Sequence, residues 1–167
     1  MNIAEKQNEL VHEIKSWLGT PYHSGAKLKN IGVDCGQLLI AVYEKAGLLK
    51  RGECSPGYYS PEWHLHRSEE KYLKWVEKFC VKVNPPYQPG DIALFQFGRC
   101  ISHGAMIVDY PLLIHAYVGY GVIQSTINEA LLCKKNGESR LKGVYRWAEF
   151  SADTRLISNT NAWARFL

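Results

Sequence analysis

The sequence lacks several features that would assign it to a specialised class of protein. Its N-terminus, MNIAEKQNELVHEIKSWLG, has no long apolar run, so we expect neither a secretory signal nor a membrane span. We therefore expect the protein to be synthesised in the cytoplasm. It contains no C-x-x-C pair, which argues against a structural zinc site, and we expect no metal and no cofactor. No arginine-rich block or RNA-binding aromatic motif is present, which argues against nucleic acid as a partner.

Internal repeats and low-complexity segments are also absent, and the composition is that of an ordinary globular protein. Hydrophobic residues make up 46% of the 167 residues and charged residues 22%, which predicts a single domain over residues 1–167 with a buried core. The net charge of +4 is a mild basic excess that fits work near an anionic polymer without identifying one. Five cysteines, odd in number and widely scattered, predict free thiols: Cys35, Cys54, Cys80, Cys100 and Cys133.

The order of the expected elements predicts an α+β fold, with helices first and an antiparallel meander after them. Apolar spacing predicts a helix over residues 3–18 and a second one after Asp34, with Gly47 at its C-terminal cap. A third helix is expected to begin near Ser60–Pro61 or Ser68. Short runs of strand-forming residues separated by turns predict strands at 91–97, 102–109, 112–118, 121–127 and 143–150.

One cysteine stands at a chemically distinctive position, in the stretch GVDCGQLLIAVYEKAG. If Asp34 caps the helix, Cys35 lies in its first turn, where free N–H groups and the helix dipole favour an anion. We therefore expect a lowered thiol pKa and a nucleophilic thiolate. The alternative is that Cys35 is one of five small buried apolar residues, and the two interpretations are balanced until a base is found.

A cysteine nucleophile needs a histidine base that a further polar group orients, and two histidines suit these roles. His103 and His115 lie on adjacent predicted strands around the turn in VDYPL. A hairpin centred near Asp109 would place them directly opposite each other on one sheet face. A slip of one residue would send them to opposite faces, so this pairing is a prediction about register. The alternative for His115 is a core histidine satisfied by the backbone.

Four motifs in sequence order resemble those of the NlpC family of papain-like cell-wall cysteine peptidases. WLGTPYHSG resembles the family's G-x-P-Y-x-x-G segment, and GVDCGQLL resembles its D-C-S-G-L nucleophile segment. QPGDIALF resembles its P-G-D-L strand, and SHGAMIV with LIHAY resembles its pair of histidine strands, with the same twelve-residue spacing. The segment YYSPEWHLHRSEEKYL further resembles the phage-associated branch of the family.

The resemblance implies a papain-like fold in which the nucleophile begins a helix packed on an antiparallel sheet of five to six strands, with the motif-bearing core at about residues 14–150. It implies that Cys35 is the nucleophile, His103 the base and then acid, and His115 the third polar residue. Around the nucleophile, it implies oxyanion or substrate-binding roles for positions at the cleft. These positions are Tyr22, His23, Asp34, Gly36 and Trp63.

The resemblance further implies hydrolysis of amide bonds in peptidoglycan stem peptides, between γ-D-glutamate and a diamino acid. Phage tail proteins are the implied partners, with the protein carried on a virion or released to the cell wall. The family's Ser-Gly after the cysteine is Gly36-Gln37 here, which leaves the specificity open. An amidase, acyltransferase or thioesterase on the same fold therefore stays an alternative, as does a tail-assembly component without catalysis.

Two further histidines, His64 and His66, would share one face of an extended segment. No third ligand for a metal is evident near them, so a polar rim or a solvated loop is the better interpretation.

Overall fold

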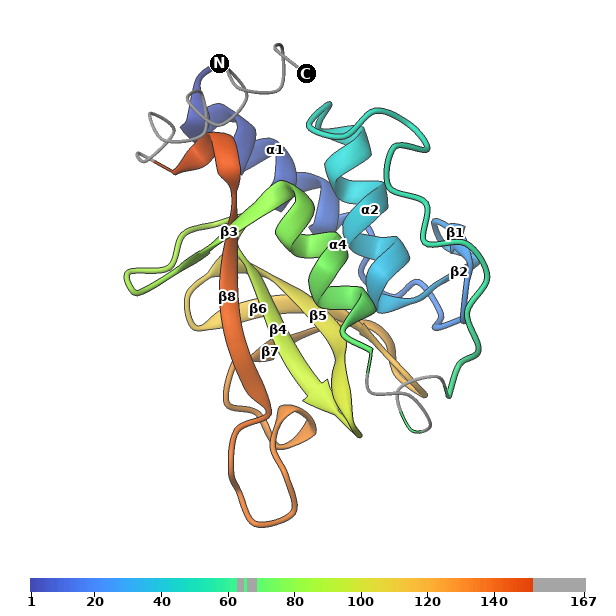
Figure 1. The fold of residues 1–167 in the computed structure, drawn as a ribbon. Helices are drawn as coiled ribbons and strands as arrows, with labels where there is room; N and C mark the ends of the chain where they lie inside the picture. Colours follow the sequence, from blue (N-terminus) through green and yellow to red (C-terminus); the bar gives the residue numbers. More distant parts are fainter. Residues whose placement is uncertain (63–64, 66–68, 152–167) are drawn as a thin grey trace, which may run out of the picture.

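The structure, a computed structural model, describes residues 1–62, 65 and 69–151 (Figure 1). The described helices are α1 (Ile3–Lys15), α2 (Cys35–Lys45) and α4 (Lys71–Phe79), with 3-10 turns η1 (Ala130–Leu132) and η2 (Ala148–Phe150). The strands are β1 (Lys27–Leu28), β2 (Gly32–Val33), β3 (Cys80–Val83), β4 (Ile92–Phe97), β5 (Cys100–Asp109), β6 (Leu112–Tyr117), β7 (Gly121–Thr126) and β8 (Leu141–Trp147). The fold is α+β, as the order of elements predicted.

The central sheet has six strands in the order β3-β8-β4-β5-β6-β7, and every ladder in it is antiparallel. All five predicted strands are present in it, and the expectation of five to six antiparallel strands is confirmed. Strand β3 was not predicted, because it follows α4 directly, from Phe79 to Cys80, with no turn residue to mark the change. The two-residue strands β1 and β2 form a separate small sheet.

The helices gather on one side of the sheet (Figure 1). Leu10 and Ile14 of α1 are fully buried with Leu38 and Val42 of α2 in the larger of two core clusters. These positions follow helical spacing in the sequence, so the apolar stripe that predicts each helix also packs it against the sheet.

The third helix begins at Lys71, after both of its predicted starting points. The N-cap residue, Glu70, makes no capping hydrogen bond with its side chain, because its carboxylate instead accepts a hydrogen bond from the Ile101 N–H of β5 at 3.0 Å. This bond fixes the start of α4 against the strand that carries His103.

Strands β4 and β5 divide their side chains between two core clusters, as the two-residue period of a strand requires. Leu94 and Met106 belong to the cluster under the helices, whereas Phe95 and Ile107 belong to a smaller cluster on the other face. The sheet is therefore buried on both faces, and residues on β5 and β6 are held in a fixed register.

The P-G-D motif has a structural role in this fold. Asp91 is fully buried, and both of its carboxylate oxygens accept hydrogen bonds from the Arg146 guanidinium of β8 at 2.8 Å. The same carboxylate accepts the Gln88 N–H at 2.7 Å. A bidentate, fully hydrogen-bonded pair of this kind sets the geometry at the start of β4.

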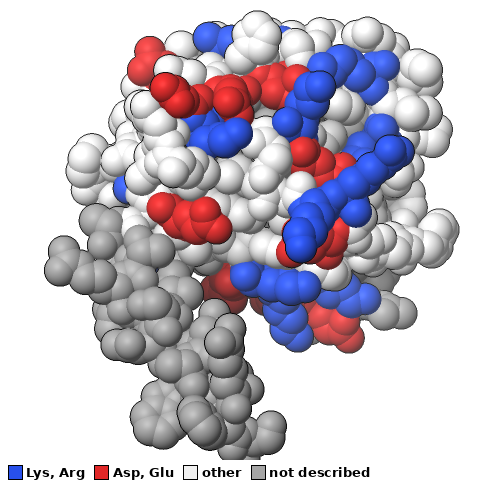
Figure 2. Space-filling view, turned by 90° about the horizontal axis from the view of Figure 1, so that it is seen from above, with Lys and Arg blue, Asp and Glu red and all other residues white. Residues whose placement is uncertain are grey.

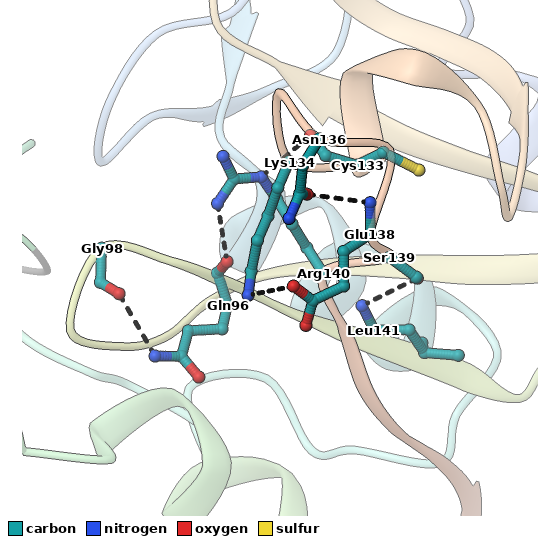
Figure 3. Close-up of polar contacts among 9 residues, drawn as sticks. All are labelled: Gln96, Gly98, Cys133, Lys134, Asn136, Glu138, Ser139, Arg140 and Leu141. Carbon is teal, nitrogen blue, oxygen red and sulfur yellow. Dashed lines mark hydrogen bonds and ion pairs between the residues drawn. The ribbon is translucent and has the colours of Figure 1, made fainter.

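Arg140 holds the connection between β7 and β8 against the end of β4 (Figure 3). The Arg140 guanidinium donates to the carbonyl oxygens of Cys133 and Gln96, each at 3.2 Å. It also lies 4.6 Å from the centre of the Phe97 ring, which in turn meets the His103 ring edge-on at 5.6 Å. The loop thus supports the aromatic surroundings of His103 from outside.

The surface seen from above the helices carries both signs of charge side by side (Figure 2). Lys27 pairs with Glu44 and Lys29 with Glu13, at 2.7 and 2.8 Å. None of the described helices combines the length and the apolar character needed to cross a bilayer.

Candidate active site

Cys35 is the first residue of α2, as predicted, and Asp34 is the N-cap. The backbone of Asp34 is extended, and its Oδ1 accepts the Gln37 N–H at 2.8 Å, which is the hydrogen bond expected of a capping aspartate. Gly47 follows the end of α2 with a positive φ of 72°, which matches its predicted terminating role. The local sequence alone is sufficient to place the thiol at a helix N-terminus.

The Asp34 carboxylate is buried and gathers donors from three segments of the chain. Besides Gln37, it accepts the Gly25 N–H at 2.7 Å and the Tyr59 hydroxyl. The Gln37 side chain also hydrogen-bonds to Tyr59, so the glutamine that replaces the family's glycine joins this network. A negative charge is therefore held in place directly beside Cys35.

The thiol contacts β5 on both sides of His103. The Cys35 Sγ donates to the Ser102 carbonyl oxygen at 3.6 Å, and the Gly104 backbone also hydrogen-bonds to the sulfur. A carbonyl oxygen can only accept, so this contact belongs to the protonated thiol. His103 itself lines the same cavity as Cys35.

His103 and His115 point toward each other and begin a chain of polar contacts. The His103 Nε2 lies 2.8 Å from the His115 Nδ1, and the His115 Nε2 lies 3.0 Å from the Ser125 Oγ of β7. All three side chains are buried. The predicted juxtaposition of the two rings is present.

The register behind this juxtaposition differs from the predicted one. Met106 pairs with Ile114 and Ile107 with Leu113, a shift of two residues from the register that would place His103 directly opposite His115. The strands turn beyond Asp109 rather than around it, and the ladder is irregular between Ile107 and Asp109. A shift by an even number of residues keeps side chains on the same face, so the two rings still meet.

The expected lowering of the Cys35 pKa is wrong. Burial of the sulfur raises its pKa to about 12, and the Asp34 carboxylate raises it further. Hydrogen bonds from the Gly104 and Gly36 backbone and from Tyr72 act in the opposite direction, but they do not outweigh burial. The helix N-terminus positions the thiol, whereas the closed surroundings keep it protonated.

Burial also keeps both histidines neutral. It lowers the pKa of His103 well below its ordinary value, with His115 adding to the effect, and it lowers the pKa of His115 to about 4. If His103 donates its Nε2 hydrogen to His115, its Nδ1 is left as an unprotonated base. His115 then carries its hydrogen on Nε2 and donates it to Ser125. This tautomer set gives His103 Nε2 and both nitrogens of His115 a hydrogen-bond partner and leaves His103 Nδ1 available as the base.

The remaining sequence-predicted positions lie at different distances from the thiol. Tyr22 and Gly36 line the cavity with Asp34, and Tyr22 is half-buried, with its pKa raised by burial and by the nearby Cys35 and Asp34. Tyr22 is held there because Thr20 pairs with Val122 of β7. At the facing glycine, Gly121, a Cβ would lie 2.5 Å from the Thr20 carbonyl oxygen.

His23 is exposed and its Nδ1 lies 3.2 Å from the Ser24 carbonyl oxygen, outside the residues that line the cavity. Trp63, His64 and His66 lie outside the described residues. In the part of the chain that the structure describes, no three His, Cys, Asp or Glu side chains cluster as metal ligands. All five cysteines, which the structure describes, are free thiols, as predicted.

Three site residues were missed by sequence reasoning: Tyr59, Tyr72 and Ser125. Ser125 is a hydroxyl at a buried position of β7, and its place beside the histidines depends on the pairing of β6 with β7. Tyr59 and Tyr72 come from the segment between α2 and the end of α4, where no local pattern indicates contact with Asp34 or Cys35.

The cavity at Cys35 has a volume of about 580 Å³ and is lined by residues of α2, α4 and the sheet. Its polar end is formed by Tyr22, Asp34, Cys35, Ser102 and His103. Its other end is formed by apolar and aromatic side chains, among them Leu49, Val76, Phe79, Ile92 and Trp147.

Comparison of this architecture with solved structures identifies its fold. A protein of the NlpC/p60 family from Bacillus cereus is 20% identical with a TM-score of 0.57, covering 84% of this chain and 40% of that one. The NlpC/p60 domain of the peptidoglycan hydrolase SagA is 17% identical with a TM-score of 0.54, covering 83% of this chain and 96% of that domain. The chain has the NlpC/p60 fold.

The NlpC/p60 fold also includes proteins that do not catalyse a reaction. RipD from Mycobacterium tuberculosis, described as a non-catalytic NlpC/p60 domain protein adapted to peptidoglycan binding, is 16% identical with a TM-score of 0.53, covering 84% of this chain and 95% of that one. No family model matches the sequence, and no curated protein matches it significantly. This chain spans less than half the length of the Bacillus cereus protein.

Proposed function

We propose that the protein is a cysteine peptidase that hydrolyses amide bonds in peptidoglycan stem peptides. The observation that carries the proposal is the contact between the Cys35 thiol and β5 on both sides of His103, with His103 in turn bonded to His115. A thiol, a neutral imidazole and an orienting group are the parts that nucleophilic cysteine catalysis requires.

In the first half of the reaction, His103 Nδ1 takes the proton of the Cys35 thiol as the sulfur attacks the substrate carbonyl carbon. His115 holds the His103 ring in orientation through Nε2 and is itself held by Ser125. The negative charge that develops on the carbonyl oxygen is stabilised by the Cys35 N–H at the start of α2 and by the Tyr22 hydroxyl.

In the second half, His103 returns the proton to the leaving amine, and the carbon–nitrogen bond breaks to leave a thioester on Cys35. Water then gives a proton to His103 and its oxygen to the acyl carbon, which releases the acid and the free thiol. The raised pKa of Cys35 means that the thiolate forms during attack rather than before it.

The substrate class is inferred from the relatives of this fold, among which SagA is a peptidoglycan hydrolase. Cleavage between γ-D-glutamate and a diamino acid, and a role with phage tail proteins on a virion or at the cell wall, follow from the sequence resemblance.

Digestion of purified muropeptides tests this function. The wild-type protein should produce new amine termini, detected by mass spectrometry, and Cys35→Ala should produce none. The matched control is Cys133→Ala, which removes a half-exposed thiol in the connection between β7 and β8, outside the residues that line the cavity, and should cleave at the wild-type rate. Absence of cleavage by the wild-type protein, or equal cleavage by Cys35→Ala, contradicts the proposal.

A second candidate function, as an amidase, acyltransferase or thioesterase, is favoured by the apolar end of the cavity. Peptidoglycan stem peptides are polar, whereas Leu49, Phe79 and Trp147 form a wall that suits an apolar acyl group. Turnover of a medium-chain acyl thioester or amide, without cleavage of muropeptides, would support this second candidate over the first.

A further inference from the structure

One tyrosine of the site has a buried hydroxyl with no nitrogen or oxygen partner among the described residues. Tyr72, in the first turn of α4, leaves part of its ring exposed while its hydroxyl is buried. A buried hydroxyl without a partner is destabilising, because it loses its hydrogen bonds to water and gains none in return. Such a group in a cavity points to an atom that it meets during function.

The atom that the Tyr72 hydroxyl meets is the sulfur of Cys35. The Tyr72 hydroxyl lies beside the sulfur in the same cavity, and its position favours the ionised form of the thiol. Room for the tyrosine is made by a glycine on the facing strand: a Cβ on Gly104 would lie 2.4 Å from the Tyr72 hydroxyl oxygen. A Cβ on Gly36 would lie 3.6 Å from the same ring.

The placement of Tyr72 is fixed from outside the catalytic motifs. Glu70, two residues earlier, accepts the Ile101 N–H of β5, so the start of α4 is fastened to the strand that carries His103. The tyrosine therefore reaches the cavity of the sulfur from the first turn of α4.

We propose that Tyr72 is a catalytic residue that donates a hydrogen bond to the Cys35 sulfur as it becomes a thiolate. This inference rests on the proposed function of Cys35 as a nucleophile. When the thiol proton passes to His103, the sulfur bears a negative charge close to the Asp34 carboxylate. The Tyr72 O–H and the Gly104 N–H share that charge, and no proton leaves the tyrosine.

The groups that face the sulfur support this assignment. Asp34 opposes a negative charge there, and the hydroxyl of Tyr59 is already donated to Asp34. Tyr22 comes from the loop on the other side and is assigned to the substrate oxygen. Tyr72 brings to the sulfur a buried hydroxyl whose hydrogen is not committed to a nitrogen or oxygen of another described residue.

The test is the pH dependence of Cys35 alkylation by iodoacetamide, followed by peptide mass spectrometry. Tyr72→Phe should keep the ring in place and lower the alkylation rate at pH 7 about tenfold, the change expected from one unit of thiol pKa. The apparent pKa of alkylation should rise correspondingly. The matched control is Tyr110→Phe, which removes a hydroxyl from a tyrosine that is 52% exposed and lies outside the residues that line the cavity, and should leave the profile unchanged.

A second variant separates donation from steric cover. If Tyr72 only covers the thiol, Tyr72→Phe will match the wild type and Tyr72→Ala will be alkylated faster, which overturns the proposal. Thermal unfolding of each variant is measured alongside, and an unchanged melting temperature shows that the change in alkylation is local. His103→Ala in the same assay distinguishes failure of this inference from failure of the proposed function. If His103→Ala slows alkylation while Tyr72→Phe leaves the profile unchanged, the role of Tyr72 is rejected and the proposed function stands.

Discussion

The two walls of the site achieve order in different ways. On the sheet wall, His103, His115 and Ser125 form a chain that gives His103 Nε2 and both nitrogens of His115 a partner. On the helix wall, Asp34 accepts three hydrogen bonds, while the Tyr72 hydroxyl lies beside the Cys35 sulfur with no nitrogen or oxygen partner among the described residues. The first wall is complete before a substrate arrives, whereas the second holds a charge and a free donor next to the sulfur. Orientation of the imidazole base and stabilisation of the charge on the sulfur are therefore assigned to separate parts of the fold.

Removing the base from the sheet wall should have the largest effect. His103→Ala should slow alkylation of Cys35 at pH 7 by about a hundredfold, because the thiol then has no imidazole to accept its proton. Rates of iodoacetamide labelling measure this, with His12→Ala on the exposed face of α1 as the control. Equal labelling of Cys35 in the two variants would show that His103 is not the base, and the sheet wall would then have no role in activating the thiol.

Acid should weaken the sheet wall next. The folded pKa of His115 is about 4, below its ordinary value, so between pH 6.5 and 4 the unfolded chain binds a proton that the folded chain does not. Stability is therefore full above the unfolded pKa and falls as the pH drops toward 4, by about 2 kcal/mol between pH 7 and pH 5. His103, whose pKa is also lowered, acts in the same direction.

Urea unfolding at pH 7 and pH 5 measures this loss. His115→Asn should show a smaller difference between the two pH values than the wild type, whereas His12→Gln should show the same difference. An identical pH dependence in His115→Asn and the wild type would mean that this ring is not held neutral by burial.

Removing the last hydroxyl of the hydrogen-bond chain from His103 through His115 should have a smaller effect. Ser125→Ala leaves the buried His115 Nε2 without its partner, which should lower the free energy of unfolding by about 1 kcal/mol. Chemical denaturation at pH 7 measures it, with Gln124→Ala on the exposed face of β7 as the matched control. Equal stabilities for the two variants would show that Ser125 does not support the histidine pair.

Removing the charge from the helix wall should speed alkylation of Cys35 rather than slow it, and this effect should be the smallest. Asp34→Asn keeps a good N-cap but removes the charge that raises the Cys35 pKa, so alkylation at neutral pH should become a few-fold faster. The pH profile of labelling measures it, with Glu44→Gln at the other end of α2 as the control. Slower alkylation would show that the charge on Asp34 assists the thiolate, which would contradict its assigned effect.

Local patterns were sufficient for most of the fold. The cap at Asp34, the helix after it and the strands around the two histidines each follow from neighbouring residues, because capping and apolar periodicity act over a few positions. The pairing of His103 with His115 was also anticipated, although through a register two residues away from the observed one. It survived because an even shift keeps both side chains on one face.

The sequence by itself determined which residues begin the helix, which alternate along the strands and which thiol stands at a helix N-terminus. Only the tertiary structure decided the protonation state of that thiol, because burial depends on what the rest of the chain lays over it. It also decided that Tyr59 and Tyr72 meet Asp34 and Cys35, since contacts between distant segments leave no periodic trace in either segment. Short-range hydrogen bonds are determined by neighbouring residues in the sequence, whereas the electrostatic character of a buried site is set by packing.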